Sequence, residues 1–219
     1  MATTKSETLQ TVYLVRHGES TENVRSSPIF EQADAQLTDV GRSQAASIAT
    51  RATRLSFDAL ISSSMLRARH TAQAISDATG TEITISDLFV ERLAPTSFVG
   101  SEWTDEFRAR FKQWEQTLYT RGQSMEDGET FDTIIERGKR ALEYLSSRPE
   151  QSLLVVTHGF FLRVLVGLTM LQDDFVPEDL RRMYKTLVTR NTGITVLIRR
   201  SDTPDVWNVL TWNDHAHLG

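Results

Sequence analysis

The sequence predicts an α/β fold with a mostly parallel central sheet, and two short stretches carry that prediction. Val12–Val15 and Leu153–Val156 are apolar, β-branched-rich runs with the composition of strands buried on both faces. Each run leads to a His-Gly pair, at His17 and at His158, and a stretch suited to a helix follows. Parallel strands of an open α/β sheet present functional residues at their carboxyl ends. The two His-Gly corners are therefore expected to face each other across one crevice.

An arginine, Arg16, precedes the first corner and bears on what the two histidines bind. A metal site is the obvious alternative, because imidazole is the commonest metal ligand. A fixed cation next to the site would repel a metal ion, whereas guanidinium matches phosphate oxygens bidentately. The glycines that follow the histidines, Gly18 and Gly159, are expected to let the backbone approach a bulky ligand. The corners thus predict a phosphate site that needs no metal.

The bulk composition fits a single domain spanning residues 1–219. The chain has 39% hydrophobic and 24% charged residues, and its length is short for two independent domains. A net charge of −5 without a basic cluster argues against a nucleic-acid partner. The absence of cysteine excludes disulfides and is compatible with a cytoplasmic location. No signal peptide and no apolar run of about 20 residues is present, so no membrane association is expected. The sequence predicts no particular oligomeric state.

Local signals place the next elements. Residues 1–10 are polar and are expected to form a loose tail, and residues 23–36 to form a loop beside the site. Thr38 is suited to cap a helix, Phe57–Ile61 to form a second core strand, and Met65–Thr79 to form a helix closed by Gly80. In the first turn of that helix, exposed amides and the helix dipole favour an anion, to which the guanidinium of Arg67 would add.

A carboxylate follows the predicted edge strand Ile83–Ile85. Glu91 comes directly after the apolar run Leu88–Val90, beside the predicted phosphate pocket. Partial burial and a neighbouring phosphate would raise its pKa and keep it protonated, as a general acid requires. The alternative is an ion pair with Arg92 or another cation.

The second half of the chain begins with an inserted segment, residues 95–128. An apolar stripe at 103, 107, 111, 114 and 118 predicts a helix that either packs in the core or overhangs the site as a lid. Phe131–Leu145 is the next predicted helix, with Glu129 at its start as a further candidate for the pocket. Another short helix is expected over Val176–Tyr184, and a hairpin closes the chain. His215 and His217 lack a clear third ligand, so a structural or solvated role is favoured over a metal site.

Five ordered motifs make a family resemblance visible. The stretch R-H-G-E-S-T-x-N at 16–23 resembles the signature of the histidine phosphatase superfamily, in its phosphoglycerate-mutase-like branch. The other four lie at 62–72, 90–92, 128–130 and 157–159, in the family's order. The resemblance implies a three-layer α/β/α sandwich, one domain over the whole chain, and a specificity segment at 95–128. That segment is also where the amino-acid sequence differs most from the family's pattern.

The resemblance also implies a mechanism through a phosphohistidine, without a cofactor. His17 would be the nucleophile, and Arg16, Arg67 and His158 would bind the phosphoryl oxygens. Glu91 would protonate the leaving group. Asn23 would add a hydrogen bond to the phosphoryl group, and the expected partner is a small phosphorylated substrate.

Three functional classes remain open on the sequence, with a phosphomonoester phosphatase favoured. A phosphoglycerate mutase would need a cationic site for a carboxylate, and the resembling mutases have two consecutive arginines in the inserted segment. Here that segment holds only Arg108, Arg110 and Arg121. A catalytically idle binding protein of the same fold is the third class, which the retained histidines, arginines and acid disfavour. The physiological substrate is not predicted.

Overall fold

The computed structural model describes residues 7–24 and 27–219, and in them six strands form one sheet in the order β3-β2-β4-β1-β5-β6. The first four strands in this order are mutually parallel, and β5 and β6 complete the sheet through antiparallel pairings. This arrangement confirms the predicted mostly parallel sheet. The strands are β1 (Thr8–Arg16), β2 (Ala59–Ser62), β3 (Ile83–Ile85), β4 (Ser152–Thr157), β5 (Ile194–Arg200) and β6 (Thr203–Asp214).

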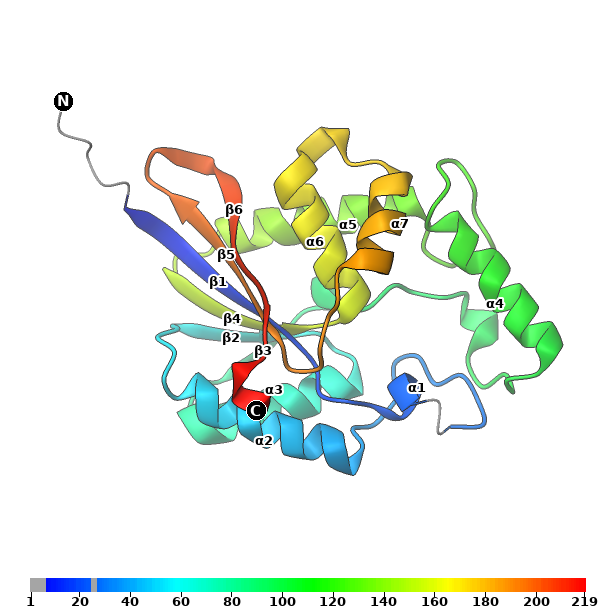
Figure 1. Ribbon diagram of the computed structural model, residues 1–219, viewed down its shortest axis with the longest axis horizontal. Coiled ribbons are helices and arrows are strands. Elements are labelled where there is room, and N and C mark those ends of the chain that lie inside the picture. The colour runs from blue at the N-terminus through cyan, green and yellow to red at the C-terminus, as the bar shows by residue number, and fades with distance from the viewer. Residues whose placement is uncertain (1–6, 25–26) are drawn as a thin grey trace.

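Helices cover both faces of the sheet, so the predicted three-layer α/β/α sandwich is also confirmed (Figure 1). One face carries α2 (Asp39–Ala52) and α3 (Leu66–Thr79). The other carries α5 (Phe131–Ser146), α6 (Gly159–Leu171) and α7 (Pro177–Thr186). Two further helices, α1 (Thr21–Val24) and α4 (Asp105–Thr117), lie beyond one end of the sheet, and 3-10 turns occur at Asp87–Phe89, Thr96–Phe98, Gln172–Asp174 and Ala216–Leu218.

Strand β4 shows why the apolar runs read as fully buried strands. Leu153 and Val155 belong to the core cluster beneath α5 and α6, whereas Leu154 and Val156 belong to the cluster beneath α2 and α3. Successive side chains of a strand point to opposite faces, so a strand covered on both faces needs apolar residues at every position.

Local signals at helix ends behave as predicted. The Thr38 side chain accepts a hydrogen bond from the backbone N–H of Gly41 at 3.0 Å and caps α2. Helix α3 ends at Thr79, and Gly80 follows with a φ of 73°, a left-handed conformation that glycine adopts without a steric penalty.

Two predicted boundaries are wrong. Thr8–Gln10 form the beginning of β1, and the Gln10 side chain is buried and donates to the carbonyl of Leu145 at 2.9 Å, so these residues are not a loose tail. The rest of that predicted tail, residues 1–6, lies outside the described residues. Trp103 precedes α4 and packs edge-on against Phe30, so the helix is shorter than the apolar stripe suggested. No helix in the described part of the chain is long and apolar enough to cross a membrane.

Candidate active site

The two His-Gly corners meet at the carboxyl edge of the sheet. β1 and β4 are neighbouring parallel strands, and their register pairs Arg16 with Thr157, so that a histidine follows each strand at the same level. The imidazole rings of His17 and His158 lie 4.9 Å apart between centroids, and both residues are buried. The crevice expected from the sequence is therefore present.

A cavity of about 910 Å³ opens at this edge. Five of the six predicted site residues line it, namely Arg16, His17, Asn23, Arg67 and Glu91. The sixth, His158, is fully buried next to His17 and does not form part of the cavity wall. The wall also contains Glu22, from α1, and Arg92.

The hydrogen bonds of His17 fix its tautomer. Nδ1 lies 2.6 Å from the carbonyl oxygen of Gly18, which only accepts, so Nδ1 carries the proton. Nε2 then has a lone pair, and Arg67 Nε donates to it at 3.2 Å. Burial, followed by the charges of Arg67 and Arg16, lowers the pKa of His17 well below its usual value. The imidazole is therefore neutral, which is the form that can act as a nucleophile once Arg67 turns toward a ligand.

The neutral state of His17 has a measurable consequence. An exposed imidazole gains its proton as the pH falls through about 6.5, whereas a lowered pKa moves that transition to more acidic pH. In a proton NMR titration of the ligand-free protein, the ring signals of His17 are expected not to shift between pH 7.5 and 6. Assignment uses the signals missing from His17→Ala, and a titration midpoint near 6.5 for those signals would contradict the neutral state.

His158 is held differently from His17. Its Nε2 lies 2.8 Å from the hydroxyl of Ser63, whereas its Nδ1 is buried without a hydrogen-bond partner among the described residues. Burial, Arg67 and His17 lower the pKa of His158 well below the usual value, in that order of effect. If the Ser63 hydroxyl donates to Nε2, the proton resides on Nδ1 and is available to a ligand. The sequence predicts no individual role for Ser63, which lies in the motif at 62–72.

Two guanidinium groups supply fixed positive charge. Arg16 donates from Nη1 to the carbonyl of Thr189 at 2.6 Å, and its buried Nε has no partner among the described residues. Burial is the main cause that lowers the Arg16 pKa to about 10, so the group still carries its charge at neutral pH. Arg67 lies 3.6 Å from Glu22 and also donates to the carbonyl of Gln32. The buried Nε of Arg16, a donor without a partner among the described residues, suits an anion.

Packing requires glycine after each of the two histidines. A Cβ at Gly18 would stand 2.5 Å from the carbonyl oxygen of Gly41, so the first corner needs glycine to pack against α2. A Cβ at Gly159 would stand 3.1 Å from Nε of Arg16. The second glycine thus leaves room for the Arg16 side chain. Close approach of a ligand to either glycine stays a prediction.

Glu91 lies at the amino terminus of α6. Its Oε2 accepts from the backbone N–H of Phe160 and its Oε1 from that of Phe161, both at 3.1 Å. Such bonds stabilise the carboxylate that remains after a proton has been given up. The alternative of an ion pair with Arg92 is wrong, because the Arg92 guanidinium pairs with Glu115 at 2.7 Å.

Two further acidic residues were read differently from the sequence. Glu129 forms an ion pair with Arg137 at 2.7 Å and is absent from the cavity wall, so its candidacy for the pocket is wrong. Glu22 is a cavity residue that sequence reasoning missed, and burial is the main cause that raises its pKa. Glu22 directly precedes Asn23, so its place in the short stretch after the first His-Gly corner was the one sign in the sequence that it could reach the cavity. The Oδ1 atom of Asn23, a predicted site residue, accepts from Asn191 Nδ2 at 3.1 Å and from the backbone N–H of Ser20 at 3.2 Å.

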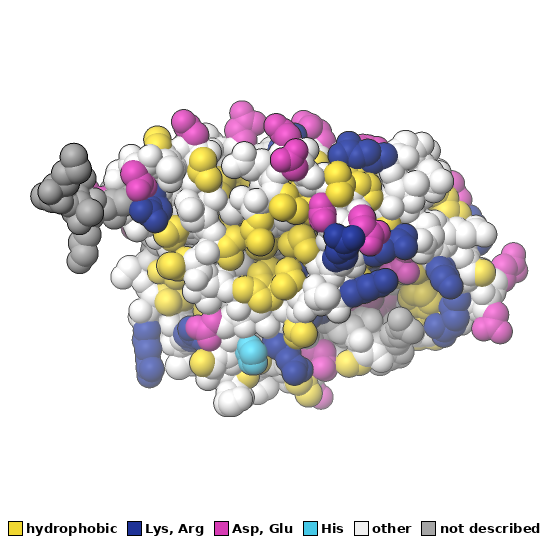
Figure 2. Space-filling view, turned by 45° about the horizontal axis from the view of Figure 1, so that its top comes forward, with side chains coloured by type: hydrophobic (Ala, Val, Ile, Leu, Met, Phe, Trp, Pro, Cys, Tyr) yellow, Lys and Arg dark blue, Asp and Glu magenta, His cyan; other side chains and the backbone are white. Residues whose placement is uncertain are grey.

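The outer wall of the cavity comes from α4 and α7. Trp103 and Phe111 line it from the inserted segment and Tyr184 from α7, whereas Phe107 and Trp114 are buried in the core. The apolar stripe therefore packs in the core through Phe107 and Trp114 and lines the cavity through Trp103 and Phe111. Its role as a lid stays a prediction. Figure 2 shows Lys and Arg side chains gathered on the right-hand half of the molecule, where these helices lie, and the cations that line the cavity there are Arg108, Lys112 and Lys185.

The two C-terminal histidines have structural contacts. His217 Nε2 lies 3.0 Å from the hydroxyl of Thr192, and His215 Nδ1 lies 2.8 Å from the carbonyl of Asn213. Within residues 7–24 and 27–219, no group of three or more His, Asp or Glu side chains is arranged to hold a metal ion. The structural alternative fits these two residues.

Comparisons with known proteins identify the class. A sequence profile of the histidine phosphatase superfamily (branch 1) matches residues 12–215. A protein of Erwinia tasmaniensis described as "Probable phosphoglycerate mutase GpmB" is 33% identical over 213 residues, which cover 94% of each chain. Escherichia coli proteins of the same description are 34% identical over 161 residues, 71% of this chain and 73% of theirs. The chain belongs to the histidine phosphatase superfamily, whose members transfer or hydrolyse phosphoryl groups.

Several solved structures of similar fold are named as phosphatases. The alpha-ribazole phosphatase from Shigella flexneri matches with a TM-score of 0.75 at 20% identity, covering 94% of this chain and 96% of that one. A mycobacterial glucosyl-3-phosphoglycerate phosphatase in complex with VO3 matches with a TM-score of 0.74 at 19% identity, covering 94% and 100%. Phosphoserine phosphatase from Entamoeba histolytica, in complex with 3-phosphoglyceric acid, matches with a TM-score of 0.72 at 21% identity, covering 96% and 100%. At these identities the likeness establishes the fold alone.

Proposed function

We propose that this protein is a phosphomonoester phosphatase that acts through a phosphohistidine on His17. The observation that carries the proposal is the state of that imidazole at the cavity. Its Nδ1 proton is held by the Gly18 carbonyl, its Nε2 lone pair faces Arg67, and Arg16 lies beside it on the cavity wall. A neutral nucleophile in contact with Arg67, on a cavity wall that also carries Arg16, suits attack on a phosphoryl group.

Two chemical steps follow from this arrangement. His17 Nε2 attacks phosphorus while the bond from phosphorus to the organic oxygen breaks, and Glu91 gives the departing oxygen its proton. Water then attacks the phosphohistidine, Glu91 takes up the proton of that water, and inorganic phosphate leaves with His17 neutral again. Arg16, Arg67, His158 and Asn23 bind the phosphoryl oxygens and offset the charge of the transition state. The substrate is a small phosphorylated molecule, and the segment 95–128 selects its organic part.

Hydrolysis of p-nitrophenyl phosphate tests the proposal directly. The purified protein is expected to release p-nitrophenol and phosphate in equal amounts. A panel of alkyl, sugar, nucleotide and amino-acid phosphates compared by kcat/KM would then define the organic part. Absence of hydrolysis across the panel would favour the catalytically idle class.

A second candidate, a phosphoglycerate mutase, is favoured by the name of the curated relatives. The chain lacks the consecutive arginines of the resembling mutases in its inserted segment, and Arg110 there is paired with Glu126 at 2.7 Å. A coupled assay for interconversion of 2- and 3-phosphoglycerate separates the two activities. Interconversion faster than release of inorganic phosphate would favour the mutase.

Metal removal should leave the activity intact. Fixed guanidinium groups supply the positive charge that a metal would otherwise bring to the phosphoryl group. After prolonged treatment with EDTA, the rate of p-nitrophenyl phosphate hydrolysis is expected to equal that of the untreated protein. Loss of activity that only a divalent ion restores would contradict this expectation and revive a metal site at His17 and His158.

A further inference from the structure

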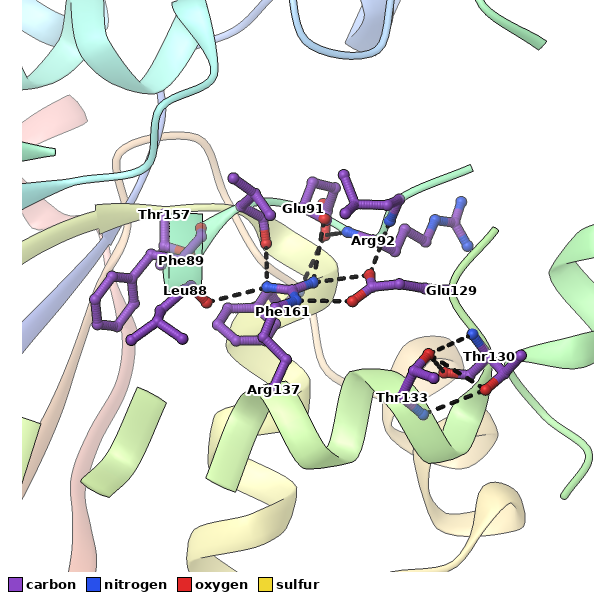
Figure 3. Close-up of polar contacts among 12 residues, drawn as sticks. Leu88, Phe89, Glu91, Arg92, Glu129, Thr130, Thr133, Arg137, Thr157 and Phe161 are labelled. Atoms are coloured by element: carbon purple, nitrogen blue, oxygen red, sulfur yellow. Dashed lines mark hydrogen bonds and ion pairs between the residues drawn. The ribbon is translucent and has the colours of Figure 1, made fainter. Parts of the chain in front are cut away.

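A buried ion pair lies behind Glu91, on the side away from the cavity. Arg137, from α5, donates from Nε to Glu129 Oε1 at 2.7 Å and from Nη2 to Glu129 Oε2 at 2.8 Å, a bidentate geometry (Figure 3). The two side chains are only 9% and 10% exposed. Neither residue lines the cavity, so the pair does not touch a substrate bound there.

The remaining donors of Arg137 hold the backbone that leads to Glu91. Nη1 donates to the carbonyls of Leu88 at 3.0 Å and Val90 at 2.8 Å, and Nη2 donates to the carbonyl of Glu91 itself at 3.2 Å. Leu88 lies in the 3-10 turn Asp87–Phe89, and Val90 and Glu91 follow in a stretch with no regular secondary structure. One rigid, planar guanidinium thus replaces the backbone partners that the stretch lacks.

The other member of the pair fixes the chain beyond Glu91. Glu129 Oε2 accepts from the backbone N–H of Leu93 at 2.8 Å, and the backbone N–H of Glu129 donates to the carbonyl of Leu93 at 2.7 Å. The Arg137 guanidinium also lies 4.1 Å from the ring centroid of Phe161, whose backbone N–H donates to the Glu91 carboxylate. The pair therefore contacts both chain segments that set where this carboxylate points.

We propose that Arg137 and Glu129 are positioning residues for the proton donor, which hold Glu91 at the distance and angle that proton transfer requires. The proposal rests on the proposed phosphatase function, in which Glu91 protonates the leaving group. General acid catalysis needs the donor within hydrogen-bond reach of the leaving oxygen, so a small displacement reduces its contribution. A purely structural pair would affect the amount of folded protein and would treat all leaving groups alike.

The leaving group distinguishes the two roles. An alkyl phosphate expels a basic alkoxide that needs the proton, whereas p-nitrophenyl phosphate expels a stable phenolate. We therefore expect Arg137→Met to lower kcat/KM for an alkyl phosphate by a large part of the roughly 10²–10⁴-fold contribution of a general acid. The value for p-nitrophenyl phosphate is expected to change much less. In the Glu91→Gln background, Arg137→Met is expected to add no further selective loss, because the two changes remove the same proton transfer.

Companion variants keep the test decisive. Removing one member of a buried ion pair destabilises a protein, so the double change Arg137→Met with Glu129→Gln, which leaves no unpaired charge, is measured beside the single changes. Arg199→Met is the matched control, because Arg199 also donates to carbonyls, of Ser146 at 2.9 Å and Pro204 at 2.7 Å, and lies over an aromatic ring. The alkyl-to-aryl ratio is expected to stay unchanged in that control. Far-ultraviolet circular dichroism and thermal unfolding verify that each variant is folded.

Each outcome settles one point. An alkyl-to-aryl ratio that falls in the folded Arg137 variants and not in Arg199→Met supports the positioning role. The positioning role is overturned if the alkyl-to-aryl ratio of kcat/KM is unchanged in the folded Arg137 variants and Glu91→Gln still shows its selective loss for the alkyl phosphate. If Glu91→Gln itself shows no selective loss, the proton-donor role in the proposed function has failed, and the positioning role fails with it.

Discussion

Replacing His17 by alanine is expected to abolish turnover of every phosphomonoester. His17 is the only histidine among the described residues that line the cavity, and its unprotonated Nε2 lies 3.2 Å from Arg67 Nε. Without it the phosphoryl group has no covalent acceptor, and the binding groups alone cannot replace a nucleophile. The loss in kcat is expected to reach about 10⁴-fold or more, the scale seen when a catalytic nucleophile is deleted.

The phosphoenzyme gives this prediction a second measurement. Denaturing the unmodified protein in detergent at alkaline pH, during turnover of a radiolabelled substrate, is expected to trap a phosphate on the chain that later acid treatment releases, and His17→Ala is expected to trap none. His70→Ala is a matched control, because His70 lies exposed on α3 and contributes nothing to the site. Activity of His17→Ala within tenfold of the unmodified protein would remove His17 from the role of nucleophile.

The sheet and its two His-Gly corners could be predicted from local sequence. A strand buried on both faces must be apolar at every position, so Val12–Val15 and Leu153–Val156 are recognisable without any partner. The helix caps at Thr38 and Gly80 are equally local, since each depends on the conformation of one residue. Parallel pairing of the two strands then brings His17 and His158 together, because Arg16 and Thr157, which precede them, are paired at the ends of β1 and β4.

Features that depend on distant partners could not be predicted in this way. Thr8 and Gln10 are polar, yet they belong to a strand because β5 pairs with them and the carbonyl of Leu145 accepts from the Gln10 side chain. Gly18 owes its identity to the backbone of Gly41 on α2. The position of Glu129 at the start of a helix makes it a candidate for the pocket. The sequence does not reveal that its carboxylate pairs with Arg137 and accepts from the backbone N–H of Leu93. Each of these depends on tertiary contacts that no short window of sequence contains.

The second large effect is expected from Glu91→Gln, and it should depend on the leaving group. Glutamine keeps the size of the side chain and its carbonyl can still accept one backbone N–H, but it cannot donate a carboxylic proton. For an alkyl phosphate, whose alkoxide is strongly basic, kcat/KM is expected to fall roughly 10²–10⁴-fold, the usual contribution of general acid catalysis. For p-nitrophenyl phosphate the phenolate departs without help, so the loss in phosphorylation should be much smaller.

The comparison must use kcat/KM, because slow hydrolysis of the phosphohistidine would limit kcat for both substrates alike. Glu22→Gln is the matched control, since Glu22 is the other cavity carboxyl close to Arg67, at 3.6 Å, and the structure gives it no contact with the α6 amides that hold Glu91. That control is expected to leave the ratio of alkyl to aryl kcat/KM unchanged. A ratio that falls in Glu22→Gln and stays constant in Glu91→Gln would transfer the proton-donor role to Glu22, whose pKa burial already raises. Equal losses for both substrates in Glu91→Gln would show that its carboxylate acts on the site by charge and hydrogen bonding rather than by giving up a proton.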